Sequence, residues 1–347
     1  MIRARFLIAA VAMILVTVGA APPPATAQTK TIELRYASYM PENHVVARGE
    51  KYWAQQIEQR SGGRIKVRIY FAEALGKPTT YASLVQNRAA DVATVVPGWH
   101  PGRFPLLEIL NLPFAWPSGD VANRVLYELA QKGYFEGELS KGGLKVASLF
   151  ATDPYNFIGV RPAHTPKDLQ AVKIRSGGGP WTPYIEQLGA APVSFPTPDL
   201  YLNLDKKIID GTFISLASAY GLKLHEVTKH VTVANMGGYS FTIAMNRQLY
   251  ASLAPDLQKV VDDVFVDTME HNQGARYDEE SKQALAAFQR AGATIYTPTA
   301  KEIEEWKAPA RKVIERWIAD MEGKGLPGRR IVDDLVSLAA RHGVKPY

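Results

Sequence analysis

The chain has 347 residues, with 40 Lys and Arg against 34 Asp and Glu, and it contains no cysteine. This length allows a large buried core divided between two domains. The absence of cysteine excludes disulfides, thiol catalysis, cysteine-ligated zinc and a lipid-anchored amino terminus. The formal charge of +6 is small and the basic residues are interspersed with acidic ones, which argues against nucleic-acid binding and leaves a weak preference for small anions.

The first 27 residues have the organisation of a secretory signal peptide. Arg3 and Arg5 precede an apolar run that is shorter than the ~20 residues of a membrane-spanning helix, and Pro22–Pro24 close it. We therefore expect residues 1–27 to be a signal peptide cleaved near Ala27, and the mature chain to be soluble and exported to the periplasm.

From Ile32 the sequence alternates between strand-like and helix-like segments. In the first helical segment Val45, Trp53 and Ile57 recur at helical spacing, whereas the strand segments are short and apolar or alternating. The segments are predicted as strands at 32–40, 64–71 and 91–96 and as helices at 43–63 and 79–90. This order indicates a mostly parallel sheet covered by helices.

A second series of the same kind follows Ala151. Its segments are predicted as strands at 157–161, 172–175 and 192–195 and as helices at 180–189 and 199–208, with a further helix opening at Thr165–Pro166. The fold class is therefore predicted to be α/β with two lobes. Residues 28–150 with 239–270 are expected to form lobe I, and 151–238 with 293–347 to form lobe II.

One long helical pattern is expected to connect the two lobes. It runs from 255 to 291, which corresponds to ~55 Å, more than the width of one small domain. A strand at 239–246 precedes it, and a strand at 293–299 and a helix at 300–323 follow. Several crossings between discontinuous domains suit a hinge, and a cleft between two such lobes is a common ligand site.

The motifs of catalytic and metal sites are incomplete in this chain. His225 and His230 are five residues apart, so they do not share a helix face as the zinc-protease motif requires. The "SGGGP" stretch at 176–180 has neither the spacing of a dinucleotide-binding loop nor the ending of a phosphate-binding loop, and no Gly-x-Ser-x-Gly motif is present. We expect a protein that is not an enzyme and uses neither a metal nor a cofactor.

Arg175 ends a short strand in the stretch "QAVKIRSGGGPW", residues 170–181. Its position at the carboxyl edge of the strand is where open α/β sheets bind ligands, and the glycines that follow allow close approach of the backbone. A guanidinium pairs both oxygens of a carboxylate, which lysine does not. The alternative is a surface arginine before a loop.

Several long stretches resemble one protein family. They are "GGRIKVRIYFAEALG", "EILNLPFAWPS", "LQAVKIRSGGGPWTPYIEQLGAAPVSFPTPDLYLNLDKKIIDG" and "LKLHEVTKHVTVANMGGYSFTIAMNRQLYASLAPDLQKVV". In content, order and spacing they resemble the DctP-type solute-binding proteins of tripartite ATP-independent periplasmic (TRAP) transporters, across essentially the whole mature chain.

The resemblance implies a two-lobed periplasmic binding protein fold that closes over a small organic acid. It implies that Arg175 holds the ligand carboxylate, and that the loaded protein delivers its solute to integral membrane subunits, with uptake driven by an ion gradient. No nucleic acid is expected as a partner, and the sequence is compatible with a monomer.

The chain departs from the family pattern at two places. Members that bind dicarboxylates or sugar acids usually carry an asparagine where this chain has the stretch Phe213–Ser215, and a second arginine where it has Tyr155. A pocket without that amide and second cation leaves further polar groups of a ligand unpaired, at ~1–3 kcal/mol each. The expected ligand is therefore a monocarboxylate with an aromatic or apolar body.

Ten residues are candidates for the ligand site. Aromatic side chains would pack on an aromatic ligand, the Tyr155 hydroxyl would donate to it, and the loop after the first strand reaches the cleft in the family. Each ring could instead belong to the core, and Glu42 could serve the helix that follows it. The candidates are Arg175, Tyr155, Phe213, Ser215, Trp99, Phe150, Trp181, Met40, Glu42 and His44.

Three other functions remain open at this point. A dicarboxylate or sugar-acid receptor of the same family would need polar groups that the sequence does not identify. An orphan receptor that presents its ligand to a sensor kinase would share the same fold, as would a periplasmic enzyme built on it.

Overall fold

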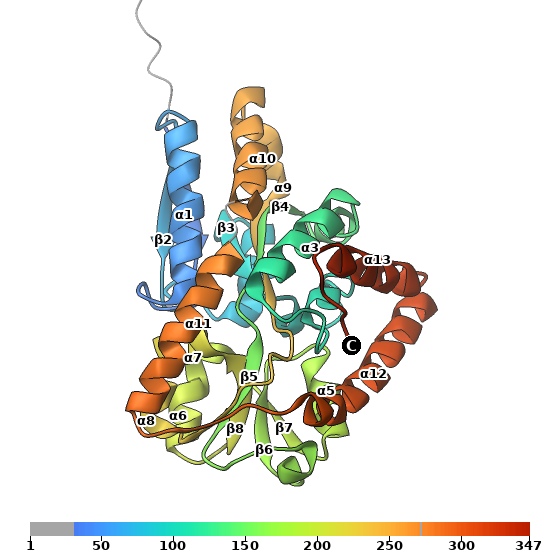
Figure 1. Ribbon diagram of the computed structural model, residues 1–347. Coiled ribbons are helices and arrows are strands. Elements are labelled where there is room, and N and C mark those ends of the chain that lie inside the picture. The colour runs from blue at the N-terminus through green and yellow to red at the C-terminus, as the bar shows by residue number, and fades with distance from the viewer. Residues whose placement is uncertain (1–30, 271–272) are drawn as a thin grey trace, which may run out of the picture. The chain divides into compact units, whose positions relative to one another are not determined.

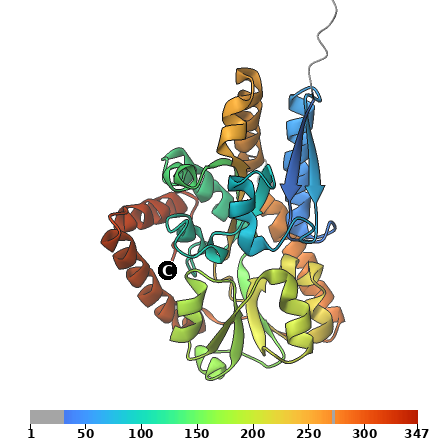
Figure 2. The same ribbon diagram turned by 180° about the vertical axis from the view of Figure 1, so that it is seen from behind.

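A computed structural model of the chain describes residues 31–270 and 273–347. The expected signal peptide at 1–27 lies outside these residues. From Thr31 onward the chain forms one compact unit with two β-sheets, each covered by helices (Figures 1 and 2). The predicted α/β class is confirmed. Among the described helices none is long and apolar enough to cross a membrane.

The first sheet has five strands in the order β2-β1-β3-β10-β4. β1 pairs in parallel with β2 and β3, whereas β10 is antiparallel to β3 and β4. The strands are β1 (Ile32–Ala37), β2 (Ile65–Tyr70), β3 (Val92–Val95), β4 (Leu144–Ala151) and β10 (Ser240–Asn246). The helices that follow these strands in the chain or pack beside them are α1 (Val45–Arg60), α2 (Tyr81–Gln86), α3 (Gly119–Gln131), α4 (Glu136–Lys141) and α9 (Arg247–Ser252).

The second sheet has six strands in the order β11-β9-β5-β8-β6-β7. Its strands are β5 (Tyr155–Gly159), β6 (Lys173–Ser176), β7 (Ala191–Ser194), β8 (Gly211–Ser215), β9 (His230–Thr232) and β11 (Thr294–Tyr296). The helices of this lobe are α5 (Trp181–Gln187), α6 (Leu200–Asp205), α7 (Leu216–Gly221) and α8 (Leu224–Val227). Because β6 is parallel to both β7 and β8, the carboxyl ends of these three strands lie along one edge.

Two adjacent segments carry the chain between the sheets. One joins β4 to β5, and the other joins β9 to β10. Tyr155 N donates to Gly237 O, and Met236 N donates to Tyr155 O at 2.8 Å. The Asn156 side-chain oxygen accepts from the backbone N–H groups of Ala234 and Asn235, both at 2.9 Å. The two crossing segments are therefore bonded to one another where they pass between the lobes.

Helices α10 (Pro255–Glu270) and α11 (Gln273–Arg290) occupy the expected long helical segment. α10 packs on β4, and α11 packs on α3 of the first lobe and α7 of the second. Part of the single helix expected from 255 to 291 falls on residues 271–272, which lie outside the described part of the chain.

The carboxyl-terminal helices α12 (Ala300–Gly323) and α13 (Gly328–Arg341) contact both lobes. α12 packs on α5 of the second lobe, whereas α13 packs on α3 of the first, and the pair runs beside both sheets in Figures 1 and 2. The expected assignment of all of 293–347 to lobe II does not describe α13, which packs on α3 of lobe I as well as on α12.

The helix expected at Thr165–Pro166 is a single 3₁₀ turn, Pro166–Leu169. A capping box between Thr165 and Asp168 closes this turn. Ala171 then has a φ of 58°, which ends the turn before β6. The capping box is therefore formed, but the residues after it lack the apolar periodicity that would extend the turn into a helix.

The contact of α11 with α3 depends on two glycines. A Cβ atom on Gly274 would lie 1.9 Å from Gly119 O, so the two backbones touch. Replacing Gly274 with alanine should lower the free energy of unfolding by about 3 kcal/mol, because the helices have to move apart. Urea denaturation followed by circular dichroism would measure the change.

Gly137 in α4 provides the matched control, since its Cβ would meet no atom within 4 Å. Gly137→Ala should leave stability unchanged or raise it by up to about 1 kcal/mol. Equal stability of Gly274→Ala and the wild type would contradict the contact.

Candidate functional site

Arg175 is buried at the carboxyl end of β6, with 2% of its surface exposed. Its Nε donates to Phe195 O and its Nη2 donates to Thr197 Oγ1, both at 3.0 Å. Within the part of the chain that the structure describes, no carboxylate forms an ion pair with it. A buried cation held by neutral acceptors alone strongly favours an added anion, because an uncompensated charge is costly in a dry interior.

The glycines after Arg175 bring the two lobes into backbone contact. Gly178 has a φ of +86°, and a Cβ atom there would lie 2.2 Å from Gly98 O in the first lobe. A Cβ on Gly177 would meet the Tyr239 hydroxyl at 2.7 Å. Any side chain at either position would force the lobes apart, so these glycines allow the first lobe to cover Arg175.

Aromatic rings surround this arginine from both lobes. The Tyr155 ring lies 5.1 Å from that of Trp181 and 5.4 Å from that of Tyr239. Burial raises the pKa values of Tyr39, Tyr155 and Tyr239, and the nearby positive charge of Arg175 opposes this rise in each. A Cβ atom on Gly177 would lie 2.7 Å from the Tyr239 hydroxyl and 3.2 Å from Arg175 Nη1, so this ring of the first lobe lies close to the guanidinium.

The first lobe contributes a connected row of rings. Tyr39 lies edge-on to Trp99 at 5.0 Å, and Phe150 stacks on its β10 neighbour Phe241 at 5.1 Å. The indole N–H groups of Trp99 and Trp181 are buried, and neither has a hydrogen-bond partner among the described residues. The structure thus brings Arg175, Tyr155 and Trp181 together and places Trp99 and Phe150 in the facing lobe.

Phe213 and Ser215 on β8 lie behind this group. Phe213 packs against Trp181 at 5.4 Å and also against Phe157, Tyr184 and Trp306, so much of its ring is committed to the core. The Ser215 hydroxyl accepts from Ser218 N at 3.2 Å and caps α7. Both side chains therefore support the site from behind its rings.

The loop after β1 contributes less than the sequence analysis expects. Glu42 does not lie with the Arg175 group, because its side chain is 68% exposed and pairs with Lys51 at 2.9 Å. Met40 is buried in the core of the first lobe. Tyr39, which precedes it, packs on Trp99, and the charge of Arg175 opposes the rise that burial causes in the pKa of Tyr39. The sequence does not single out Tyr39, because adjacent residues in a loop have no fixed periodicity.

His44 joins the lobes. Its Nδ1 accepts from Val46 N at 3.2 Å, which caps α1, and its Nε2 lies 3.4 Å from Ser218 O in α7. Burial lowers the pKa of His44 to about 4, and the charge of Arg48 acts in the same direction. This histidine is therefore a neutral contact between α1 and α7.

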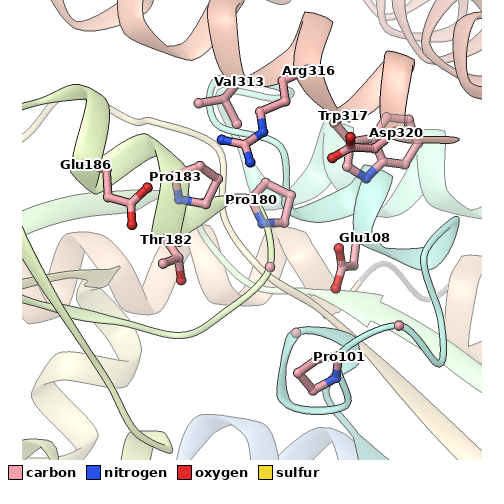
Figure 3. A pocket seen from close by; sticks show the side chains of 13 residues that line it. Pro101, Glu108, Pro180, Thr182, Pro183, Glu186, Val313, Arg316, Trp317 and Asp320 are labelled. Atoms are coloured by element: carbon pink, nitrogen blue, oxygen red, sulfur yellow. The ribbon is translucent and has the colours of Figure 1, made fainter. Parts of the chain in front are cut away.

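A hollow of about 410 Å³ adjoins the contact between Gly98 and Gly179 (Figure 3). Its walls come from the loop after β3, the start of α5, and α12. Figure 3 shows Glu108, Arg316 and Asp320 around it, and burial raises the pKa of Glu108 to about 7. Arg175 is not part of its lining, so this hollow is separate from the buried arginine.

No set of three His, Asp or Glu residues suited to a metal ion occurs within 31–270 and 273–347. His225 and His230, considered above as a zinc motif, lie in α8 and β9. The polar groups around Arg175 are tyrosine hydroxyls, Thr197 and backbone carbonyls, which suit an organic anion held by an arginine.

Two α/β lobes that meet over a buried arginine define a two-lobed periplasmic binding protein. The chain belongs to the DctP family, described as bacterial extracellular solute-binding protein, family 7, whose model matches residues 36–320. The resemblance noted in the sequence is thereby confirmed. The family consists of extracytoplasmic transport proteins.

Solved structures similar to this chain include two TRAP solute-binding proteins. One, from an unidentified marine microbe, is specific for aromatic acid ligands and contains 3-hydroxybenzoate; it is 29% identical, with a TM-score of 0.82, over 90% of this chain and 98% of its own. Another, from Rhodoferax ferrireducens with copurified benzoate, is 28% identical, with a TM-score of 0.83, over 90% and 99%. A solute-binding protein of Albidiferax ferrireducens is 26% identical over 275 residues, 75% of this chain and 77% of that relative.

The contact made by His44 predicts a specific pH dependence. Its pKa is about 4 in the folded protein and ordinarily about 6.5, so between these values the unfolded chain binds more protons and stability falls as the pH falls. His44→Asn keeps an acceptor for Val46 N and removes the titration. From pH 7 to pH 5 the wild type should lose about 2 kcal/mol more than this variant.

Urea denaturation of both proteins at the two pH values would test this. Other titrating groups are shared, so the difference isolates His44. Identical pH dependence of the two proteins would show that the ring is not held neutral.

Proposed function

We propose that this protein is the extracytoplasmic receptor of a TRAP transporter and captures an aromatic monocarboxylate in the periplasm. The observation that supports this most strongly is Arg175, a buried guanidinium with no carboxylate partner among the described residues, covered by rings from both lobes. TRAP solute-binding proteins bind small organic acids and act with membrane permease subunits. The loaded receptor would deliver its solute to these subunits, with uptake driven by an ion gradient.

In this proposal Arg175 binds the ligand carboxylate through nitrogen atoms not used by Phe195 and Thr197. Tyr155 donates to the same carboxylate, and its ring, with Trp181 and Tyr239, packs on the ligand body. Trp99 and Phe150 approach from the first lobe, and Phe213 backs Trp181.

The proposal that the ligand is aromatic rests on the tyrosine and tryptophan side chains around Arg175. Tyrosine and tryptophan supply flat apolar surface and few charges, so a second carboxylate would lack a cation. The two solved relatives at 29% and 28% identity carry 3-hydroxybenzoate and benzoate, in agreement with this choice. Benzoate-like and phenylpropenoate acids are the proposed ligands.

Replacing Arg175 with alanine should remove the anchor for the carboxylate. Leaving an anion buried without its partner costs ~3–5 kcal/mol, so affinity should fall several hundredfold or more. Titration calorimetry with benzoate and cinnamate would measure the loss. Arg329→Ala is the matched control, since Arg329 is exposed and pairs with Glu315, and its affinity should equal that of the wild type. Undiminished binding by Arg175→Ala would refute the assignment.

A thermal-shift panel separates an aromatic monocarboxylate receptor from a dicarboxylate or sugar-acid receptor. Benzoate and cinnamate should raise the melting temperature, because a ligand at 100 times its dissociation constant adds about 2.7 kcal/mol of stability. Succinate and glucuronate should leave it unchanged. The reverse order would assign the chain to the dicarboxylate or sugar-acid group.

A further inference from the structure

Asp153 is a buried carboxyl group at the point where the chain crosses from the first sheet to the second. It lies between β4 and β5 and has no exposed surface. Its Oδ2 accepts from Ala217 N at 3.3 Å, at the start of α7, whereas its Oδ1 has no hydrogen-bond partner among the described residues. A buried acceptor without a donor costs stability unless a ligand or a water completes it.

Tyr277 on α11 carries a second buried polar atom that has no hydrogen-bond partner among the described residues. Its side chain is 2% exposed, and its hydroxyl also lacks a partner within the described chain. Burial raises the pKa of the Asp153 carboxyl to about 7, and Ala217 N and the side chains of Ser215 and Ser281 oppose this rise. Ser281 lies one helical turn beyond Tyr277 on α11. Tyr277 and Asp153 therefore lie beside the same face of α11, and the Asp153 charge in turn raises the pKa of Tyr277.

The rings proposed to hold the ligand lie between this pair and Arg175. The Tyr277 ring is 6.4 Å from that of Phe150. Tyr155 follows Asp153 by two residues, and its ring lies 5.4 Å from that of Tyr239. The Tyr239 hydroxyl and Arg175 Nη1 both border the position that a Cβ atom on Gly177 would take, at 2.7 and 3.2 Å. A ligand body packed on these rings would thus have the cation at one end and two unpaired polar atoms at the other.

We propose that Asp153 and Tyr277 bind a hydroxyl group on the end of the ligand remote from its carboxylate. This rests on the proposed function and narrows the ligand to a hydroxylated aromatic acid. A hydroxyl has one hydrogen to donate and lone pairs to accept with. Asp153 Oδ1 supplies the acceptor and the Tyr277 hydroxyl supplies the donor. An ammonium group would need three acceptors and would leave the Tyr277 hydrogen unpaired.

A site built to pair a hydroxyl rejects the analogue that lacks it, since its own buried polar atoms then stay unpaired. Each hydroxylated acid and its parent form a matched pair that differs at one group. Suitable pairs are 3- or 4-hydroxybenzoate with benzoate, and 4-hydroxycinnamate with cinnamate. In at least one pair the wild type should bind the hydroxylated acid about tenfold or more tightly.

The test is titration calorimetry of these pairs on the wild type, Asp153→Asn and Tyr277→Phe. The asparagine oxygen keeps the bond to Ala217 N, and its NH₂ group replaces the free acceptor. Tyr277→Phe keeps the ring and removes the donor. Each variant should lower the preference for the hydroxylated acid to about threefold or less, with affinity for the parent acid unchanged. Unchanged parent affinity also shows that the variant is folded and that the Arg175 end is intact.

Three results would overturn the proposal. If the wild type binds parent and hydroxylated acids equally, no side chain recognises the ligand hydroxyl, although the proposed function stands. If the wild type prefers the hydroxylated acid and both variants keep this preference, a residue other than Asp153 and Tyr277 binds the hydroxyl. A wild type that binds none of these acids would overturn this inference together with the proposed function.

Discussion

The arrangement of the molecule depends on one uncompensated charge. Arg175 lies at the end of β6 and is held by Phe195 O and Thr197 Oγ1, which orient the guanidinium without neutralising it. Placing a cation there is costly in the absence of an anion. That charge opposes the rise that burial causes in the pKa values of Tyr155 and Tyr239, and the contact of Gly178 with Gly98 brings the first lobe over the buried arginine.

The lobes meet through contacts of different kinds. In one contact the backbones of Gly98 and Gly178 touch directly. In another, the neutral His44 ring at the start of α1 contacts Ser218 O in α7. Between them lie aromatic residues that each lobe can bury against the other or against a ligand. Because rings pack similarly well on one another and on an aromatic ligand, ligand exchange would need little rearrangement of the core.

Much of the fold could be predicted from the sequence, because the alternation of strands and helices has clear periodicity and turn signals. The helix at 300–323 has the bounds that were predicted. β4 and α13 were not predicted: β4 is buried on both faces and shows no alternation, and the packing of α13 depends on α3. Arg175 was proposed from its position at a strand end before glycines and from the family resemblance, and the structure buries it at the end of β6. Tyr39 and Tyr239 were not predicted, because only the tertiary fold brings them toward Arg175. Asp153 was not predicted either, because its burial depends on the crossing between the two sheets.

The pair α12 and α13 affects how the lobes can move. Since α12 packs on α5 and α13 on α3, separating the lobes changes the angle between these helices at the short connection that contains Gly325, which has a φ of 71°. This connection acts at a different place from the two hydrogen-bonded crossings near Tyr155. Restraints at separate places oppose sliding of one lobe past the other, so a separation of the lobes would have to bend the chain at Gly325 and at the two crossings together.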